Sequence, residues 1–179
     1  MYPIIRMGKA ILSSRGKTMD ILEPLSTFHR AWPWDIDPWK DLNNGRIVTL
    51  FDLGRIALAQ QTGLNASLIR NRWGIVVAGN TTRYRKRITM MQAFEMRTRC
   101  VGWDARFFYM EQAMWRGEAC CNHILIRGAI TSKAGIVAPQ RVVEDMGHQA
   151  ASPELPAWVQ AWAAADHTRP WPPEMPAAR

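Results

Sequence analysis

The sequence predicts an α+β fold in which one long helix is wrapped by a strongly curled, mostly antiparallel sheet. The segment from about Asn43 to Gln61 has apolar residues at helical spacing and at most of its other positions as well. A helix that is apolar on nearly all sides is normally buried. Long segments of strand character follow it, and a curled sheet built from them keeps unpaired edges. We therefore expect those edges to pair with further copies of the chain, as a homodimer or homotetramer.

One further strand is expected before the long helix, over Pro24–Trp34. Prolines within residues 33–38 then interrupt regular structure, because proline has a fixed φ and no amide hydrogen. Asn43 or Asn44 can cap the helix that follows, and Gly63 can end it.

The segments after the helix are separated by short turns, and the pattern is typical of antiparallel strands connected as a meander. The expected strands are Gly74–Arg87, Phe94–Cys100, Arg106–Trp115 and Ala119–Thr131, with turns at Val101–Asp104 and Arg116–Glu118. A short helix is expected over Gln140–Met146. We expect residues 1–151 to form a single domain that includes the N-terminal segment. Residues 152–179 add a short helix and a tail rich in Pro and Trp, packed on or beside that domain.

The composition suits one globular domain, because 47% of the 179 residues are apolar and 21% are charged. The three cysteines form no Cys-x-x-Cys pair, which favours a reducing compartment and a cytoplasmic location. The four histidines are scattered without the spacing of metal ligands, so no metal site is expected. No apolar run approaches the ~20 residues that a transmembrane helix needs.

The formal net charge of +8 fits three partners: nucleic acid, an anionic membrane or a polyanionic small molecule. Aromatic residues are not interleaved with the basic run in the way that single-strand binders require, so nucleic acid is not an expected partner. Alternation predicts that Arg83, Arg85 and Arg87 share one strand face. The cations concentrated in this part of the chain are Arg83, Arg85, Lys86, Arg87, Arg97 and Arg99.

A motif before the long helix carries a family resemblance. Residues 34–46 read Trp-Asp-Ile-Asp-Pro-Trp-Lys-Asp-Leu-Asn-Asn-Gly-Arg. This resembles the signature of the 4-hydroxybenzoyl-CoA thioesterase-like hotdog family, in which Asp-x-Asp is followed by Gly-His-x-Asn-Asn at the start of the central helix. The resemblance covers roughly residues 24 to 146, and Lys40 and Asp41 stand where the family has Gly and His. The residues that match are Asp35, Asp37, Leu42, Asn43 and Asn44.

The resemblance implies a hotdog fold and the hydrolysis of acyl-CoA or another acyl thioester. Asp37 is the expected general base or nucleophile. The backbone N–H of Asn44 or Gly45, at the N-terminus of the helix, is the expected oxyanion donor. Asn43 is expected to position the substrate or water, or to cap the helix. Coenzyme A enters only as part of the substrate, and no cofactor is implied.

The expected substrate-binding residues are Trp39, Asp41, Arg83, Arg85 and Arg87. Trp39 and Asp41 flank the site, and the three arginines are expected to bind the phosphates of coenzyme A.

Each of these assignments has a simpler alternative. Asp37 could instead satisfy turn amides, Asp41 could cap the helix, and the arginines could be a solvated strand face. Asp52 and Arg55, three residues apart on the helix, are expected to form a structural ion pair. Because Asp41 replaces the motif histidine, the second hypothesis is a hotdog protein that binds acyl-CoA without hydrolysing it. A dehydratase is disfavoured for the same reason.

Overall fold

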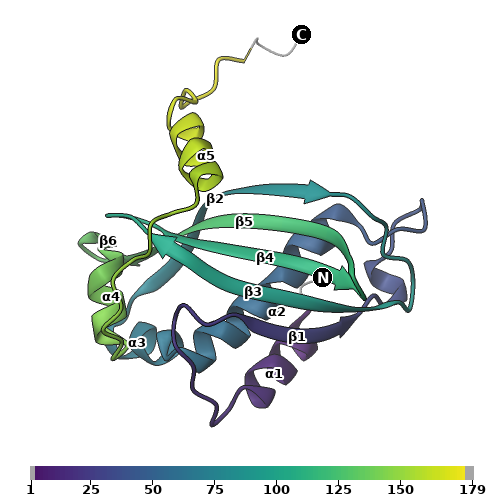
Figure 1. Cartoon of the computed structure of the whole chain (residues 1–179), viewed down its shortest axis with the longest axis horizontal. Coiled ribbons are helices and arrows are strands. Elements are labelled where there is room, and N and C mark those ends of the chain that lie inside the picture. Colours follow the sequence, from purple (N-terminus) through teal and green to yellow (C-terminus); the bar gives the residue numbers. More distant parts are fainter. Residues whose placement is uncertain (1–2, 176–179) are drawn as a thin grey trace.

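The computed structural model describes residues 3–175, in which a six-stranded antiparallel sheet curls around helix α2 (Figure 1). This is the predicted hotdog arrangement. The helices are α1 (Ile4–Ser13), the 3-10 turn η1 (Pro33–Asp35), α2 (Asn44–Gln61), α3 (Leu64–Asn71), α4 (Pro139–Asp145) and α5 (Ala157–His167). The strands are β1 (Leu25–Arg30), β2 (Gly74–Tyr84), β3 (Ala93–Trp103), β4 (Phe108–Arg116), β5 (Ala119–Ser132) and β6 (Gly135–Val137).

The strand order is β1-β3-β4-β5-β2, with β6 added beside β5. The predicted meander is therefore correct for β3, β4 and β5 but wrong for β2, which pairs with β5 rather than with β3. Residues 85–92 carry the chain from one side of the sheet to the other, and β3 then pairs with β1. Alternating polarity identifies a strand but not its neighbour, which is why the sequence placed β2 wrongly.

Helix α2 lies on the concave face of the sheet and supplies the centre of the core. Its residues Leu50, Phe51 and Leu53 are fully buried, against Met96 of β3 and Ile124 of β5. Apolar residues around most of the helix are thus explained by the sheet that surrounds it.

The helix approaches the sheet most closely at Gly54. A Cβ atom at this position would lie 2.8 Å from Met96 Sδ and 2.9 Å from Gln112 Nε2. Gln112 of β4 is fully buried, and its Nε2 donates to Phe51 O at 2.8 Å and to Thr98 Oγ1 at 3.0 Å. A glycine at this point lets the helix backbone and the buried amide meet at hydrogen-bonding distance.

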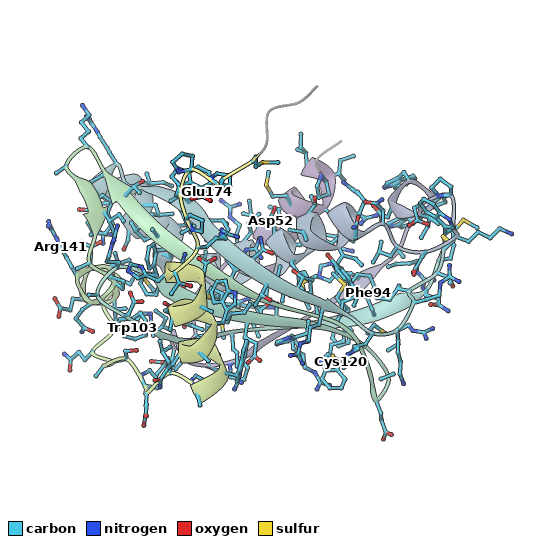
Figure 2. The ribbon with its side chains drawn as sticks, turned by 90° about the horizontal axis from the view of Figure 1, so that it is seen from above. Asp52, Phe94, Trp103, Cys120, Arg141 and Glu174 are labelled. Atoms are coloured by element: carbon cyan, nitrogen blue, oxygen red, sulfur yellow. The ribbon has the colours of Figure 1, made fainter. Side chains whose placement is uncertain are left out.

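Two helices are absent from the sequence-based interpretation. Helix α1 packs on α2, and α3 follows α2 directly after Gly63, whose φ of +84° ends the long helix. The C-terminal helix α5 packs on the convex face, where Val159 joins Val101, Tyr109 and Leu125 in a small buried cluster. Figure 2 shows α5 and α2 on opposite sides of the sheet.

Three predicted boundaries were wrong. The segment Val101–Asp104, expected to be a turn, belongs largely to β3, which continues to Trp103 through an irregularity at Gly102. The turn lies after Trp103, between β3 and β4. It is stabilised by Asp104 Oδ1, which accepts from the backbone N–H groups of Arg106 and Phe107 at 2.7 and 2.8 Å. The strand expected over Pro24–Trp34 ends at Arg30, before η1, and β2 ends at Tyr84 rather than at Arg87.

Candidate active site

A cleft opens where the N-terminus of α2 meets the segment after β2. Its volume is about 420 Å³. The loop before α2 supplies one wall, the segment after β2 supplies the other, and β5 lies between them. The lining residues are Asp37, Trp39, Asp41, Asn43, Asn44, Ile47, Tyr84, Arg85, Lys86, Arg87 and Asn122. Seven of the predicted site residues therefore come together in one place, whereas Gly45 and Arg83 are not part of the lining.

Asp37 closes the loop that leads into α2. Its Oδ1 accepts from the backbone N–H of Trp39 at 2.9 Å and from that of Asp41 at 3.2 Å. Its own backbone N–H donates to Asp41 O at 2.8 Å. No hydrogen bond to Asp37 Oδ2 is found within residues 3–175, although the side chain lines the cleft. One oxygen of the carboxylate thus holds the loop, and the second has no partner in that part of the chain.

Asp41, at the position of the motif histidine, ties this loop to the opposite wall of the cleft. Its Oδ2 accepts from Arg87 Nε at 3.2 Å, and its Oδ1 accepts from the backbone N–H of Ile88 at 3.1 Å. The guanidinium of Arg87 also donates to Trp39 O, and the Leu42 N–H donates to Ile88 O at 2.8 Å. These contacts make Asp41 a bridge between two loops.

The N-terminus of α2 faces the cleft with some of its amides already occupied. Asn43 caps the helix through its Oδ1, which accepts from the Arg46 N–H at 3.1 Å. The Gly45 N–H donates to Asn44 Oδ1 at 2.8 Å. No partner for the Asn44 N–H is found within residues 3–175, and early helical amides lack an intrahelical acceptor. Of the two expected oxyanion donors, Asn44 is therefore the one with an open N–H.

Asp35, the first acid of the motif, is a structural residue for which the sequence suggested no role. Its carboxylate is fully buried and accepts from Arg6 and Arg46, each at 2.7 Å. The Trp32 N–H donates to the same carboxylate at 2.9 Å, and the Asn43 N–H donates to Asp35 O at 2.9 Å. Asp35 thus joins α1, the loop and the start of α2. The sequence feature that could have indicated this role is Arg46 in the first turn of the helix that follows Asp35.

The ionised form of Asp35 is favoured by these partners. Burial alone would raise the pKa of the carboxyl, but the Trp32 backbone N–H, Arg46 and Arg6 outweigh burial, so the pKa lies below its ordinary value. The loop therefore has an ionised carboxylate behind it at neutral pH, and the two guanidinium groups neutralise its charge.

The basic segment divides into two groups. Arg85, Lys86 and Arg87 lie beyond the end of β2 and line the cleft, so the expectation that Arg83, Arg85 and Arg87 share a strand face was wrong. The backbone N–H groups of Arg85 and Lys86 both donate to Cys121 O, at 2.9 and 3.1 Å, and this contact ends the regular pairing.

The two arginines of β3 are ion-paired away from the cleft. Arg97 pairs with Glu95 at 2.8 Å, and Arg99 Nε donates to Glu111 at 2.7 Å. Neither is part of the lining of the cleft, and each is engaged by a carboxylate of the sheet.

A residue that the sequence did not single out forms part of the cleft. Asn122 lies on β5 opposite Tyr84 of β2, and only 3% of its surface is exposed. Its position on the concave face, next to Ile47 of α2 in the lining, places a polar amide in the cleft.

A second, smaller hollow lies farther along α2 and is almost entirely apolar. Its volume is about 100 Å³, and it lies between the C-terminal half of α2 and strands β2, β4 and β5. Arg55 is its one charged lining residue. The predicted ion pair between Arg55 and Asp52 is confirmed, and Arg55 also donates to Gln112 Oε1 at 2.6 Å.

Within residues 3–175, no group of three His, Cys, Asp or Glu side chains is placed to hold a metal ion. Of the helices there, none has both the length and the hydropathy that a membrane span requires.

The chain is similar to proteins of one family. The family model described as the thioesterase-like superfamily matches residues 31–163, which include the whole cleft. Protein THEM6 of Xenopus laevis is 29% identical over 167 residues, covering 90% of this chain and 79% of the relative.

Solved structures show the same fold at low sequence identity. YbaW, a probable thioesterase from Escherichia coli, aligns with a TM-score of 0.63 at 13% identity, over 68% of this chain and 98% of that one. The protein SAV2348 from Staphylococcus aureus, solved in complex with CoA, aligns with a TM-score of 0.64 at 9% identity, over 80% and 96%.

Proposed function

Because the chain belongs to the thioesterase-like superfamily, we propose that it hydrolyses acyl-CoA or a related acyl thioester in the cleft at the N-terminus of α2. The observation that carries this proposal is the meeting of three groups in one cleft. They are a carboxylate (Asp37), a helix N-terminus with an open amide (Asn44) and a cationic wall (Arg85, Lys86 and Arg87). The carboxylate and the open amide serve the hydrolysis itself, and the cations serve the binding of a polyanionic leaving group.

In the proposed reaction Asp37 acts through Oδ2, the oxygen that the loop does not use. As a general base it takes a proton from water, and the water oxygen attacks the thioester carbon. The carbonyl oxygen becomes an oxyanion and accepts from the Asn44 N–H, near the positive end of the α2 dipole. The C–S bond then breaks, the leaving thiolate takes the proton that Asp37 holds, and the products are a carboxylic acid and a free thiol.

The same carboxylate has a second available role, as the nucleophile itself. Attack by Oδ2 on the thioester forms an acyl-aspartyl anhydride and expels the thiol, and water then hydrolyses the anhydride. A single turnover in H₂¹⁸O tests for the nucleophilic route. ¹⁸O in Asp37 establishes that route, because general-base catalysis leaves the protein unlabelled and only attack of water on the aspartyl carbon of the anhydride places the label there.

The cationic wall fits the phosphates of coenzyme A. Arg85 and Lys86 are exposed and lie on the side of the cleft opposite Asp37. The guanidinium of Arg87 is oriented by its contacts with Asp41 and Trp39 O. Guanidinium and ammonium groups bind phosphate through charge-assisted hydrogen bonds.

We also propose that the edge strand β2 pairs with the same strand of a second copy. Ile75, Val76 and Val77 on this strand are between 48% and 59% exposed. An antiparallel pairing centred near Gly79 would set these residues of one copy opposite residues 81–83 of the other. It would thereby bring the apolar hollow of one copy near the cleft of the other, where an acyl chain could extend.

Binding without hydrolysis is the second candidate, and two observations favour it. Oδ1 of Asp37 is engaged in the loop, and Asp41 in place of the motif histidine is engaged with Arg87. A protein of this kind would hold acyl-CoA in the same cleft and release no thiol.

The test is thiol release from short, long and aromatic acyl-CoAs by the wild type and by Asp37→Asn. Asparagine keeps the Oδ1 acceptor that the Trp39 and Asp41 amides need, so the loop should stay intact. Asp104→Asn is the matched control, because Asp104 Oδ1 accepts two backbone N–H groups in a similar turn outside the cleft. Loss of turnover in Asp37→Asn, with wild-type turnover in Asp104→Asn, supports hydrolysis by Asp37. Wild-type turnover in Asp37→Asn refutes it.

Binding to a non-hydrolysable thioether analogue of acyl-CoA decides between the two candidates. Tight binding by a wild type that releases no thiol favours the binding protein. Turnover by the wild type excludes it.

A further inference from the structure

Two buried side-chain amides lie on the concave face of neighbouring strands, and their surroundings differ. Gln112 of β4 and Asn122 of β5 are 1% and 3% exposed. Each faces α2, Gln112 near the middle of the helix and Asn122 near its start. A buried amide normally has hydrogen-bond partners in the protein, because losing those of water without replacement costs free energy.

Gln112 meets this requirement completely. Its Nε2 donates to Phe51 O and Thr98 Oγ1, and its Oε1 accepts from Arg55 at 2.6 Å. Its role is therefore accounted for by the fold, since it links α2 to β3 and β4.

Asn122 does not meet it. The one side-chain contact found for it in residues 3–175 is from Nδ2 to Met114 Sδ at 3.9 Å, and a thioether sulfur is a weak acceptor. The side chain lines the cleft, and its Oδ1 and the second N–H of Nδ2 have no hydrogen-bond partner in residues 3–175. An apolar residue of the same shape at this position would therefore stabilise the fold as well as the amide does.

We infer that Asn122 is a substrate-binding residue whose side-chain N–H donates to a carbonyl oxygen of the thioester-bearing arm of the substrate. This rests on the proposed thioesterase function. The other side chains of the cleft leave a need for a neutral donor to such a carbonyl oxygen. The carboxylates of Asp37 and Asp41 can only accept hydrogen bonds, and the cations lie on the wall after β2. A neutral donor on the floor of the cleft can hold a carbonyl oxygen without competing for the phosphates.

The inference is tested by separating activity from stability in Asn122→Leu. Leucine has the same branched arrangement of side-chain heavy atoms as asparagine but no polar atoms, and its larger methyl groups can extend into the cleft that the side chain lines. Removal of an unpartnered amide should therefore leave the melting temperature little changed. The specificity constant kcat/KM should fall by about two- to tenfold, the value of one neutral hydrogen bond. Asn122→Asp is the second variant. It is isosteric but lacks the N–H donor, and it should also lose kcat/KM.

Gln112→Leu is the matched control. Leucine would remove the hydrogen bonds to Phe51 O, Thr98 Oγ1 and Arg55 together and leave the buried Thr98 hydroxyl without this donor, so the melting temperature should fall by at least about 5 °C. A fall of similar size in Asn122→Leu would show that Asn122 is structural and would overturn the inference. So would a wild-type kcat/KM in either Asn122 variant.

Failure of the proposed function can be told apart from failure of this inference. If the wild type releases no thiol, binding of the thioether analogue of acyl-CoA is measured by calorimetry. Weaker binding in both Asn122 variants then supports the inference although the enzyme assignment has failed, and unchanged binding overturns it. If the wild type neither hydrolyses acyl-CoA nor binds the analogue, both are wrong.

Discussion

Replacing Asp35 by asparagine removes a negative charge that two guanidinium groups share. The carboxylate is fully buried, and it accepts from Arg6 and Arg46 at 2.7 Å each. Asparagine fits the same space but leaves these two cations facing a neutral amide. Breaking a buried ion pair costs about 3–5 kcal/mol. Because the Arg6 and Arg46 side chains are 18% and 17% exposed, solvent will stabilise them in part, and we expect a loss of about 3 kcal/mol in the free energy of unfolding.

The assay is urea unfolding followed by circular dichroism, with Asp145→Asn as the matched control. Asp145 pairs with Arg70, whose side chain is 55% exposed, so that variant should lose under about 1 kcal/mol. A loss below 1 kcal/mol in Asp35→Asn would refute the structural role of Asp35. The double variant Asp35→Asn with Arg6→Gln should be less destabilised than the sum of its two single changes, because the two groups contact each other.

The same residue predicts the behaviour of the protein in acid. The folded pKa of Asp35 lies below its unfolded value of about 3.9, so the unfolded chain binds the proton more readily. The contribution to stability is therefore complete above pH ~4 and is lost as the pH falls through the folded pKa. The wild type should lose stability more steeply below pH ~4 than Asp35→Asn, and parallel curves would contradict this.

Three further predictions concern positions away from the cleft. Gly54→Ala should lose about 1–3 kcal/mol in urea unfolding, because its Cβ would overlap buried atoms of the sheet, whereas Gly8→Ala in α1 has open space and should be neutral or stabilising. Burial raises the pKa of the Cys100 thiol to about 12, so mass spectrometry should find it unmodified by iodoacetamide at pH 8 unless the chain is first unfolded. Burial, with the nearby charges of Arg6 and Lys9, lowers the pKa of His29 to about 4. The unfolded chain therefore binds this proton at a higher pH than the folded protein does, and the free energy of unfolding should fall as the pH drops from ~6.5 to about 4. The fall should be smaller in His29→Gln. An NMR titration of the His29 ring with a midpoint near 6.5 would contradict this.

The sequence predicted the parts of the fold that local patterns encode. The long buried helix, the strand segments and the Asp52–Arg55 pair were correct because periodicity and spacing depend only on residues close in the chain. The position of β2 was wrong because pairing with β5 depends on contacts between residues about 50 positions apart, which alternation does not record. The segment around Gly102 was predicted as a turn but lies inside β3, because glycine occurs both in turns and at strand irregularities.

Prediction of the candidate site depended on the motif, and it failed where side-chain contacts decide a role. Asp37, Asn43, Asn44 and the segment 85–87 do lie around one cleft. The burial of Asp35 was missed, because its partner Arg6 lies 29 residues away on a helix that the sequence did not indicate, and Arg46 on the next helix was the one nearby signal. Asn122 could not be anticipated either, since a single Asn in a strand carries no signal until the absence of protein partners is seen.

The three aspartates of the loop before α2 have different chemical capacities although they lie within seven residues. Asp35 is buried with both oxygens engaged by cations and an amide, so it cannot reach a substrate. Asp41 lines the cleft, but its oxygens hold Arg87 and the amide of Ile88, and taking up a proton would weaken both contacts. Asp37 alone combines an oxygen that fixes the loop with one that has no partner in residues 3–175. A base must accept a proton without dismantling its own support, and of these three carboxylates Asp37 is the one whose contacts allow it.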